Sequence, residues 1–244
     1  MTRAAPEVVV LPDADALARH VADRLLRVLE QAQAGGRAPA VALTGGTIAD
    51  RVHAALAGAA LDSAVDWAHV DVWWGDERFV PAGDPERNAL QARRALLDLL
   101  PLDPARVHEV AASDSGVGDV AAAAVAYSDE LREHGRGRFD VVMLGVGPDG
   151  HVASLFPGSP QLDVDDQVAV AVDDSPKPPP QRVSLTYGAL NRTAEVWFLV
   201  SGEGKAEAVA RALGGADLHE VPATGVRGEE HTVWLLDEAA ASDL

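Results

Sequence analysis

Short runs of β-branched and aliphatic residues alternate along this chain with longer amphipathic stretches, and this alternation limits its possible folds more than any other feature. Short apolar runs are typical of buried strands, whereas apolar residues repeated every three or four positions indicate helices. Asp13, for example, is a suitable N-cap for a helix whose apolar positions begin with Leu17 and Val21. Strands that alternate with helices predict a Rossmann-like α/β fold, with a mostly parallel sheet and helices on both faces.

The predicted strands cover residues 7–11, 40–43, 70–74, 107–110, 139–144, 167–172, 195–200 and 232–236. Helices are predicted after Asp13, after residue 47 through 56, and over 85–100, 119–133 and 205–213. The proline-rich stretch 175–180 must be a loop. The alternatives are a linker and an ordered active-site loop, and we favour the active-site loop because strand-like segments resume directly after it. The chain shows no internal repeat, so residues 1–244 are expected to form a single domain.

The composition excludes several classes of function. The chain has no cysteine, which excludes disulfides, thiolate nucleophiles, zinc–thiolate sites and iron–sulfur clusters. Its formal net charge of −18 argues against nucleic acid as a partner, because nucleic-acid binding requires a basic patch. No apolar run approaches the roughly 18 residues that span a bilayer. The N-terminus also lacks the apolar centre of a signal peptide, so we expect a cytoplasmic protein without a membrane partner.

Four predicted strands end in polar clusters that contain glycine, at Gly45, Gly75, Gly145 and Gly202. Ligands of open α/β sheets bind in the crevice beyond the carboxyl ends of the strands. Clusters that are far apart in the sequence can therefore meet at one edge of the sheet. An acidic protein that binds an anion must collect a few cations there, although solubility alone also explains the acidity.

The cluster at 44–47 lies between a predicted strand and a predicted helix. Gly45 and Gly46 allow backbone N–H groups to approach a phosphate at the helix N-terminus, and Thr47 adds a hydroxyl donor. The alternative is a tight turn in which Thr47 is an N-cap. The cluster is not a P-loop, because no Gly-Lys-Ser/Thr sequence follows it.

Residues 145–150 match the pattern G-x-G-x-x-G, but they do not indicate a dinucleotide site. Asp149 would place a carboxylate against the pyrophosphate, and Pro157 and Pro160 leave little room for the long helix of such a site. We interpret the glycines as presenting Asp149 and His151 at the sheet edge. Neutral imidazole takes a proton from water near neutral pH, and Asp149 is close enough to orient the ring. His151 is therefore the candidate general base.

Few cations are placed to meet an anionic ligand. Asp76 and Arg78 end a hydrophobic strand, where charges must pair or meet a ligand, and Arg78 suits phosphate binding or oxyanion stabilisation. Lys205 begins a helix, where the dipole disfavours a cation unless an anion is bound, and Arg182 is a similar candidate after the proline loop. The alternatives are a salt bridge of Arg78 with a neighbouring acid and a solvated Lys205. Lys177 is interpreted as solvated.

Metal and serine-hydrolase chemistry have little support. The eight histidines are scattered, without a His-x-His or His-Glu-x-x-His pattern. The acids at 163, 165 and 166 are interpreted as a solvated loop, and no Gly-x-Ser-x-Gly elbow is present.

Together these clusters resemble the 6-phosphogluconolactonase family, within the glucosamine-6-phosphate isomerase/6-phosphogluconolactonase superfamily. The most specific match is LGVGPDGHVASLFPG at 144–158, and WGDERFVP at 74–81 is the next. SPKPPPQRVS at 175–184 and GEGK at 202–205 add weaker support. The correspondence runs in order from about residue 41 to residue 205.

The resemblance implies hydrolysis of 6-phospho-D-glucono-1,5-lactone to 6-phospho-D-gluconate, a step of the pentose phosphate pathway, with no metal or organic cofactor. It implies that His151 is the catalytic base and Asp149 its partner. The substrate-binding residues that it implies are Gly45, Gly46, Thr47, Asp76, Arg78, Arg182 and Lys205. The expected partner is a small-molecule sugar-phosphate lactone, and the expected assembly is a monomer or a weak homo-oligomer.

The chain departs from the family pattern at one loop: members commonly read SGGSTP where this chain has TGGTIA at 44–49, so Ile48 replaces a hydroxyl.

Glucosamine-6-phosphate deaminase is the first alternative function. It has Asp-Glu-Tyr where this chain has 76–78, and Phe-Asn-Glu-Pro after its Gly-Asp-Gly-His loop, and both differences favour the lactonase. A sugar-phosphate sensor domain is the second alternative. The lack of a basic region and the intact pair of Asp149 and His151 argue against it.

Overall fold

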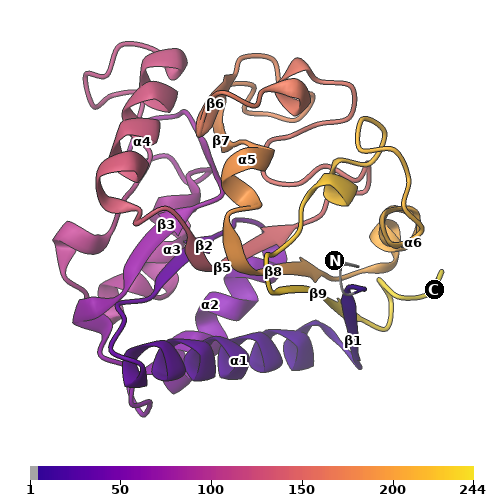
Figure 1. The fold of residues 1–244 in the computed structure, drawn as a ribbon, viewed down its shortest axis with the longest axis horizontal. Helices are drawn as coiled ribbons and strands as arrows, with labels where there is room; N and C mark the ends of the chain where they lie inside the picture. Colours follow the sequence, from indigo (N-terminus) through magenta and orange to yellow (C-terminus); the bar gives the residue numbers. More distant parts are fainter. Residues whose placement is uncertain (1–4) are drawn as a thin grey trace.

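The computed structural model describes residues 5–244 and contains two β-sheets. The larger sheet has six parallel strands in the order β1-β9-β8-β5-β2-β3 (Figure 1). These strands are β1 (Glu7–Leu11), β2 (Ala40–Leu43), β3 (Asp71–Trp74), β5 (Phe139–Gly145), β8 (Thr193–Val200) and β9 (His231–Asp237). The continuous burial of β2 and β3 is typical of parallel strands covered on both faces. The predicted α/β class with a mostly parallel sheet is confirmed.

Helices cover both faces of this sheet, as predicted (Figure 1). One face carries α1 (Ala14–Ala34), α2 (Thr47–Ala60) and α3 (Asn88–Ala95), and the other carries α4 (Val120–His134), α5 (Tyr187–Leu190) and α6 (Ala206–Leu213). Met143 of β5 points into the first of the two resulting cores and Leu144 into the second, which follows the two-residue period of a strand. Short 3-10 helices lie at Trp67–His69, Leu97–Leu99, Pro104–Arg106, Pro160–Asp163, Glu203–Lys205 and Pro222–Gly225.

A second, smaller sheet was not predicted. Its antiparallel strands, in the order β4-β7-β6, are β4 (Asp76–Arg78), β7 (Arg182–Leu185) and β6 (Ala169–Val172). Gly75 joins the two sheets, because its N–H donates to the carbonyl of Leu43 in β2 and its carbonyl accepts from the N–H of Leu185 in β7, both at 2.9 Å. The sequence does not reveal β4, since a strand of three charged residues has no apolar period.

Two predicted elements differ from the structure. The helix predicted over 85–100 begins only at Asn88, because the carboxylate of Glu77 accepts the N–H of Asn88 at 2.7 Å and fixes the helix N-terminus there. The strand predicted over 107–110 is reduced to a single bridge with Val72. These corrections shift short elements at the edge of the fold and leave the order of the central strands unchanged.

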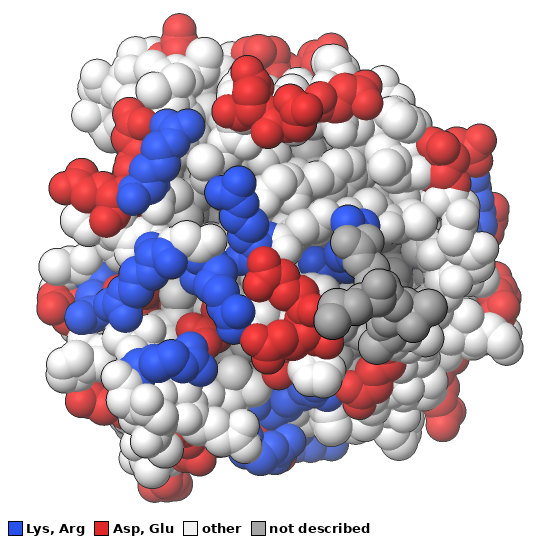
Figure 2. Space-filling view, viewed as in Figure 1, with Lys and Arg blue, Asp and Glu red and all other residues white. Residues whose placement is uncertain are grey.

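The charges on the surface are mixed. On the face shown in Figure 2, acidic side chains are spread among the basic ones and are not set apart from them. Several exposed arginines pair with acids, such as Arg211 with Glu220 at 2.7 Å and Arg138 with Glu230 at 2.8 Å. Within residues 5–244, no helix combines the length and the apolar character needed to cross a membrane.

The buried side chain of Tyr127 links α4 to the end of β3. Its hydroxyl donates to the carbonyl of Trp74 and accepts from the N–H of Trp74, both at 2.9 Å. Tyr127→Phe leaves both backbone groups without a partner, so we expect the free energy of unfolding to fall by about 1–3 kcal/mol. Urea unfolding followed by tryptophan fluorescence measures this loss. Tyr187→Phe is the matched control, because that half-buried hydroxyl makes one bond, to the carbonyl of Pro222. Equal losses in the two variants would contradict the prediction.

Candidate active site

The carboxyl ends of β2 and β5 lie side by side, at the point where the order of the strands reverses. The chain continues from β2 to β3 on one side and from β5 to β8 and β9 on the other. Such a reversal opens a crevice in which ligands of α/β proteins bind. The loops after the two strands touch there, since the hydroxyl of Thr44 accepts from the N–H of Gly145 at 3.3 Å. A cavity of about 440 Å³ is lined by both loops.

The cavity wall combines segments that are far apart in the sequence. It contains His151 and every residue predicted to bind the substrate, namely Gly45, Gly46, Thr47, Asp76, Arg78, Arg182 and Lys205. Arg51, Asn88, Lys177 and Ser201 also line it and were not among the predicted residues. The sequence analysis expected the polar clusters to meet at one edge of the sheet, and His151 does share one open cavity with Arg78 and Lys205.

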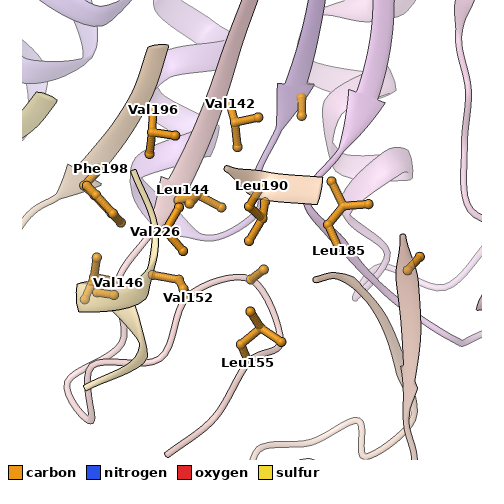
Figure 3. Close-up of a cluster of buried hydrophobic side chains, with 14 of the residues drawn as sticks. Val142, Leu144, Val146, Val152, Leu155, Leu185, Leu190, Val196, Phe198 and Val226 are labelled. Atoms are coloured by element: carbon orange, nitrogen blue, oxygen red, sulfur yellow. The ribbon is translucent and has the colours of Figure 1, made fainter. Parts of the chain in front are cut away.

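His151 stands near the end of a narrow hairpin, residues 146–152, that follows β5. Val146 and Val152 pair at the base of the hairpin, and their side chains are buried in the core cluster shown in Figure 3. Inside the hairpin, the N–H of Gly147 donates to the carbonyl of His151 at 2.9 Å. The apolar base thus fixes the polar tip at the rim of the cavity.

Asp149 and His151 are hydrogen-bonded at this tip. Oδ1 of Asp149 lies 2.5 Å from Nδ1 of His151, and two such atoms approach this closely only with a proton between them. Nδ1–H is therefore the donor and Nε2 keeps its lone pair; within residues 5–244, Nε2 has no hydrogen-bond partner. Burial alone would raise the pKa of Asp149, but the hydrogen bond and charge of His151, together with the charge of Lys177, hold it well below its usual range. The carboxylate is thus ionised and orients the ring.

Arg78 is held in the wall by polar groups of the following loop. Its guanidinium donates to the carbonyl of Glu86 at 2.8 Å and to the side-chain oxygen of Asn88. Among the described residues it forms no salt bridge with a neighbouring acid, and its buried Nε has no hydrogen-bond partner. A Cβ at Gly45 would lie 1.8 Å from that Asn88 oxygen, so only glycine lets the 44–47 turn approach Asn88 and Arg78 this closely.

The carboxylate of Glu77 lies behind these residues and is fully buried. It accepts the backbone N–H groups of Arg78, Asn88 and Ala89 at 2.7, 2.7 and 2.8 Å. Burial raises the pKa of Glu77 to about 7, against the charge of Arg87 and the three N–H donors. Glu77 therefore fixes the backbone of Arg78 and Asn88 without lining the cavity.

Arg182 of β7 ties the proline loop to the small sheet. This buried guanidinium donates to the carbonyls of Lys177, Pro178 and Pro179 at 3.0, 3.1 and 3.1 Å. Burial lowers the pKa of Arg182, and the carboxylate of Asp76 is the strongest opposing charge. Asp76 is itself held by a hydrogen bond from a buried serine hydroxyl at 2.7 Å. The loop at 175–180 thus lies against the cavity.

The prediction that Lys177 is solvated was wrong. Its Nζ lies 3.3 Å from Oδ1 of Asp149 and 3.2 Å from Nδ1 of His151. Lys205 lines the same cavity at the end of the Glu203–Lys205 turn. Burial, and then the charge of Lys177, lower the pKa of Lys205, while Asp237 opposes the shift. The positive charges of the two lysines therefore repel one another across the cavity.

The structure contradicts the N-cap alternative for the 44–47 turn. Thr47 is the first residue of α2, and Gly46 occupies the cap position with a φ of 97°, a left-handed conformation that favours glycine. Thr47 is therefore not an N-cap. Ile48, which replaces a hydroxyl of the family pattern, is buried in the core between α1 and the sheet. Arg51, one turn further along α2, lines the cavity and pairs with Asp15 of α1.

Comparison with known proteins agrees with this architecture. The family model described as glucosamine-6-phosphate isomerases/6-phosphogluconolactonase matches residues 12–234. The chain belongs to this family. Among members of the glucosamine-6-phosphate isomerase/6-phosphogluconolactonase family, the 6-phosphogluconolactonase of Streptomyces coelicolor is 51% identical over 247 residues, covering 98% of this chain and 95% of that protein. The resemblance found in the sequence is confirmed.

Solved structures show the same family fold. The crystal structure of 6-phosphogluconolactonase from Thermotoga maritima is 28% identical with a TM-score of 0.84, covering 96% of this chain and 100% of that chain. A monomeric glucosamine-6-phosphate deaminase is 18% identical with a TM-score of 0.80, covering 98% of this chain and 100% of that chain. Both enzymes share the fold of this chain, so the fold alone does not decide between their two activities.

The close packing of the hairpin predicts the effect of a small substitution. A Cβ at Gly147 would lie 2.0 Å from Nδ1 of His151 and 2.4 Å from Oδ1 of Asp149. We expect Gly147→Ala to fold and to break this hydrogen bond, because the ring must move to make room. The readout is the downfield Nδ1–H proton resonance of His151, which should disappear. Gly204→Ala is the matched control, since a Cβ there meets nothing within 4 Å. Persistence of the resonance in Gly147→Ala would contradict the prediction.

Proposed function

We propose that this chain is a 6-phosphogluconolactonase, which hydrolyses 6-phospho-D-glucono-1,5-lactone to 6-phospho-D-gluconate. The observation that carries the proposal is the Asp149–His151 pair at the rim of a cavity lined by five cationic side chains. These cations are Arg51, Arg78, Lys177, Arg182 and Lys205. A substrate with both a phosphate and an ester group suits such a cavity, because cations hold the phosphate while a base activates water toward the ester. The 51% identity to the Streptomyces coelicolor enzyme supports this assignment.

In the proposed reaction, Nε2 of His151 takes a proton from water as the water oxygen attacks the lactone carbonyl carbon. Neighbouring cations or backbone N–H groups stabilise the resulting oxyanion. Its collapse breaks the bond between that carbon and the ring oxygen, which receives the proton back from the imidazolium of His151. Asp149 holds the ring in place and stabilises its charged form. Acid–base help of this kind contributes roughly 10²–10⁴-fold to the rate.

The phosphate is assigned to Arg78, Lys205 and the turn 45–47, with Arg182 assisting. The turn lies at the N-terminus of α2, where backbone N–H groups and the helix dipole favour an anion. Arg78 lines the cavity next to this turn, and its guanidinium supplies a positive charge there. Arg78 and Lys205 both line the cavity and can form charge-assisted hydrogen bonds with a phosphate.

The residues of the cavity favour this function over that of glucosamine-6-phosphate deaminase. Arg78 supplies a cation where the deaminase pattern has tyrosine. Residues 152–154 follow His151 without a carboxylate, whereas the deaminase pattern places a glutamate there. Val152, the residue directly after His151, is buried at the base of the hairpin and does not reach the cavity. Ammonia release from glucosamine 6-phosphate would overturn the assignment.

Replacement of His151 tests the general base. We expect His151→Gln to fold normally and to lower kcat by roughly 10²–10⁴-fold, because water is no longer activated. The lactone is generated in situ from glucose 6-phosphate with glucose-6-phosphate dehydrogenase, and the formation of 6-phosphogluconate above the spontaneous rate is measured. His231→Gln, at an exposed position of β9, is the control. Full activity of a folded His151→Gln enzyme would refute the role.

Replacement of Arg78 tests the phosphate site. We expect Arg78→Gln to lower kcat/KM for the phosphorylated lactone by about 10- to 100-fold, since a charge-assisted hydrogen bond is lost. Activity on unphosphorylated glucono-1,5-lactone should change much less. Arg94→Gln, at an exposed position of α3, is the matched control. A similar loss on both lactones would place Arg78 at the reacting carbonyl and contradict the phosphate assignment.

A further inference from the structure

The chain contains only two lysines, Lys177 and Lys205, and both line the cavity. Its remaining basic side chains, apart from histidine, are arginines. A lysine ammonium is a compact point charge, whereas an arginine guanidinium spreads its charge over a planar fork. Lys177 is the cation in direct contact with the Asp149–His151 pair.

The backbone around Lys177 is fixed from several sides. Its carbonyl accepts from the guanidinium of Arg182 at 3.0 Å and from the hydroxyl of Ser175 at 2.9 Å. Its N–H donates to the same hydroxyl at 3.2 Å, and the N–H of Ser175 donates to the carbonyl of Pro180 at 3.0 Å. The position of Lys177 is therefore built into the loop, although its side chain is 38% exposed.

The contact of Lys177 with the Asp149–His151 pair has a defined electrostatic effect. Nδ1 of His151 already donates its proton to Oδ1 of Asp149, so the ammonium of Lys177 donates to the carboxylate and not to the ring. Its positive charge nevertheless lies 3.2 Å from Nδ1. A neutral ring tolerates this charge, whereas an imidazolium is repelled by it. Lys177 thus opposes the effect of Asp149, which favours the imidazolium.

Other charged groups also face His151. Arg51 lines the cavity from α2, Asp76 and Arg78 line it from β4, Arg182 lines it from β7, and Lys205 lines it after β8. The uncharged ring of Phe156 packs against the imidazole with 4.6 Å between the ring centroids. Among the described residues, Nζ of Lys177 contacts Asp149 and His151 and forms no hydrogen bond with these other groups, so a substitution there tests its charge.

We propose that Lys177 is a positioning residue that keeps His151 unprotonated, and therefore able to act as a base, toward lower pH than the Asp149–His151 pair alone would allow. The catalytic meaning of this inference rests on the proposed lactonase function. Lys177 also shares Oδ1 of Asp149 with the ring, which restrains the carboxylate in the orientation that holds Nδ1–H. Water activation by Nε2 then continues as the solution becomes mildly acidic.

The direct test is the titration of the His151 ring in the free protein, followed by long-range ¹H–¹⁵N correlation and assigned with His151→Gln. Lys177→Met removes the charge and keeps an unbranched side chain that is only one atom shorter. We expect it to move the titration midpoint of the ring to higher pH by about one unit, the size of shift that a neighbouring charge screened by solvent produces. Lys177→Arg keeps the charge and should stay close to the wild-type midpoint. An unchanged midpoint in Lys177→Met would overturn the proposal.

The pH dependence of kcat/KM for the phosphorylated lactone separates this inference from the function on which it rests. In Lys177→Met, the acid limb should move to higher pH by the same amount, with the plateau KM within about twofold of wild type. A raised KM with an unmoved acid limb would show that Lys177 binds the substrate instead, and would overturn the proposal. If no variant or wild-type protein hydrolyses the lactone while the ring titration still shifts, the lactonase function fails and the role of Lys177 stands.

Discussion

The polar site depends on an apolar anchor. Val146 and Val152 close the base of the hairpin that carries His151, and both side chains are buried in the core between the two sheets. Because a packed core resists small displacements, the tip of the hairpin is held at a fixed distance from the walls of the cavity. The absence of a side chain at Gly147 then leaves room for Asp149 and His151 to meet at 2.5 Å.

The cavity also carries an electrostatic cost that an anionic ligand would relieve. Five cations share the wall with one carboxylate, Asp76, and the pKa shifts of two of them record the crowding. Burial is the largest cause of the lowered pKa of Arg182 and of Lys205, and the charges of Arg78 and Lys177 add to it. The fold compensates with backbone carbonyls from the proline loop and with buried acids behind the wall. An anionic ligand would remove the remaining repulsion, and the folded protein already holds the positive charges in place to bind it.

The sequence predicted the parts of this arrangement that follow from local rules. Glycines after apolar strands marked Gly45, Gly145 and Gly202 as turns at one sheet edge, and the spacing of Asp149 and His151 allowed their pairing. It did not reveal interactions that depend on a distant partner. Glu77 fixes the start of α3 through backbone N–H groups that no residue pattern identifies, and Asn88 is held by that contact and by its side-chain hydrogen bonds with Arg78 and with the carbonyl of Asp76.

Lys177 and Arg51 were missed for a related reason. Lys177 lies in a loop among prolines, where the sequence has no helical or strand period. The backbone carbonyl of Lys177 is held by the guanidinium of Arg182, which belongs to β7. Arg51 lies on an exposed turn of α2, where an arginine is normally solvated.

The lactone gains a carboxylate when it is hydrolysed in the proposed reaction, so the product is more anionic than the substrate. The cations that stabilise the developing oxyanion would then hold the product as well. The surrounding charge of −18 opposes this attraction at longer range, which favours release into solvent once the product leaves the wall.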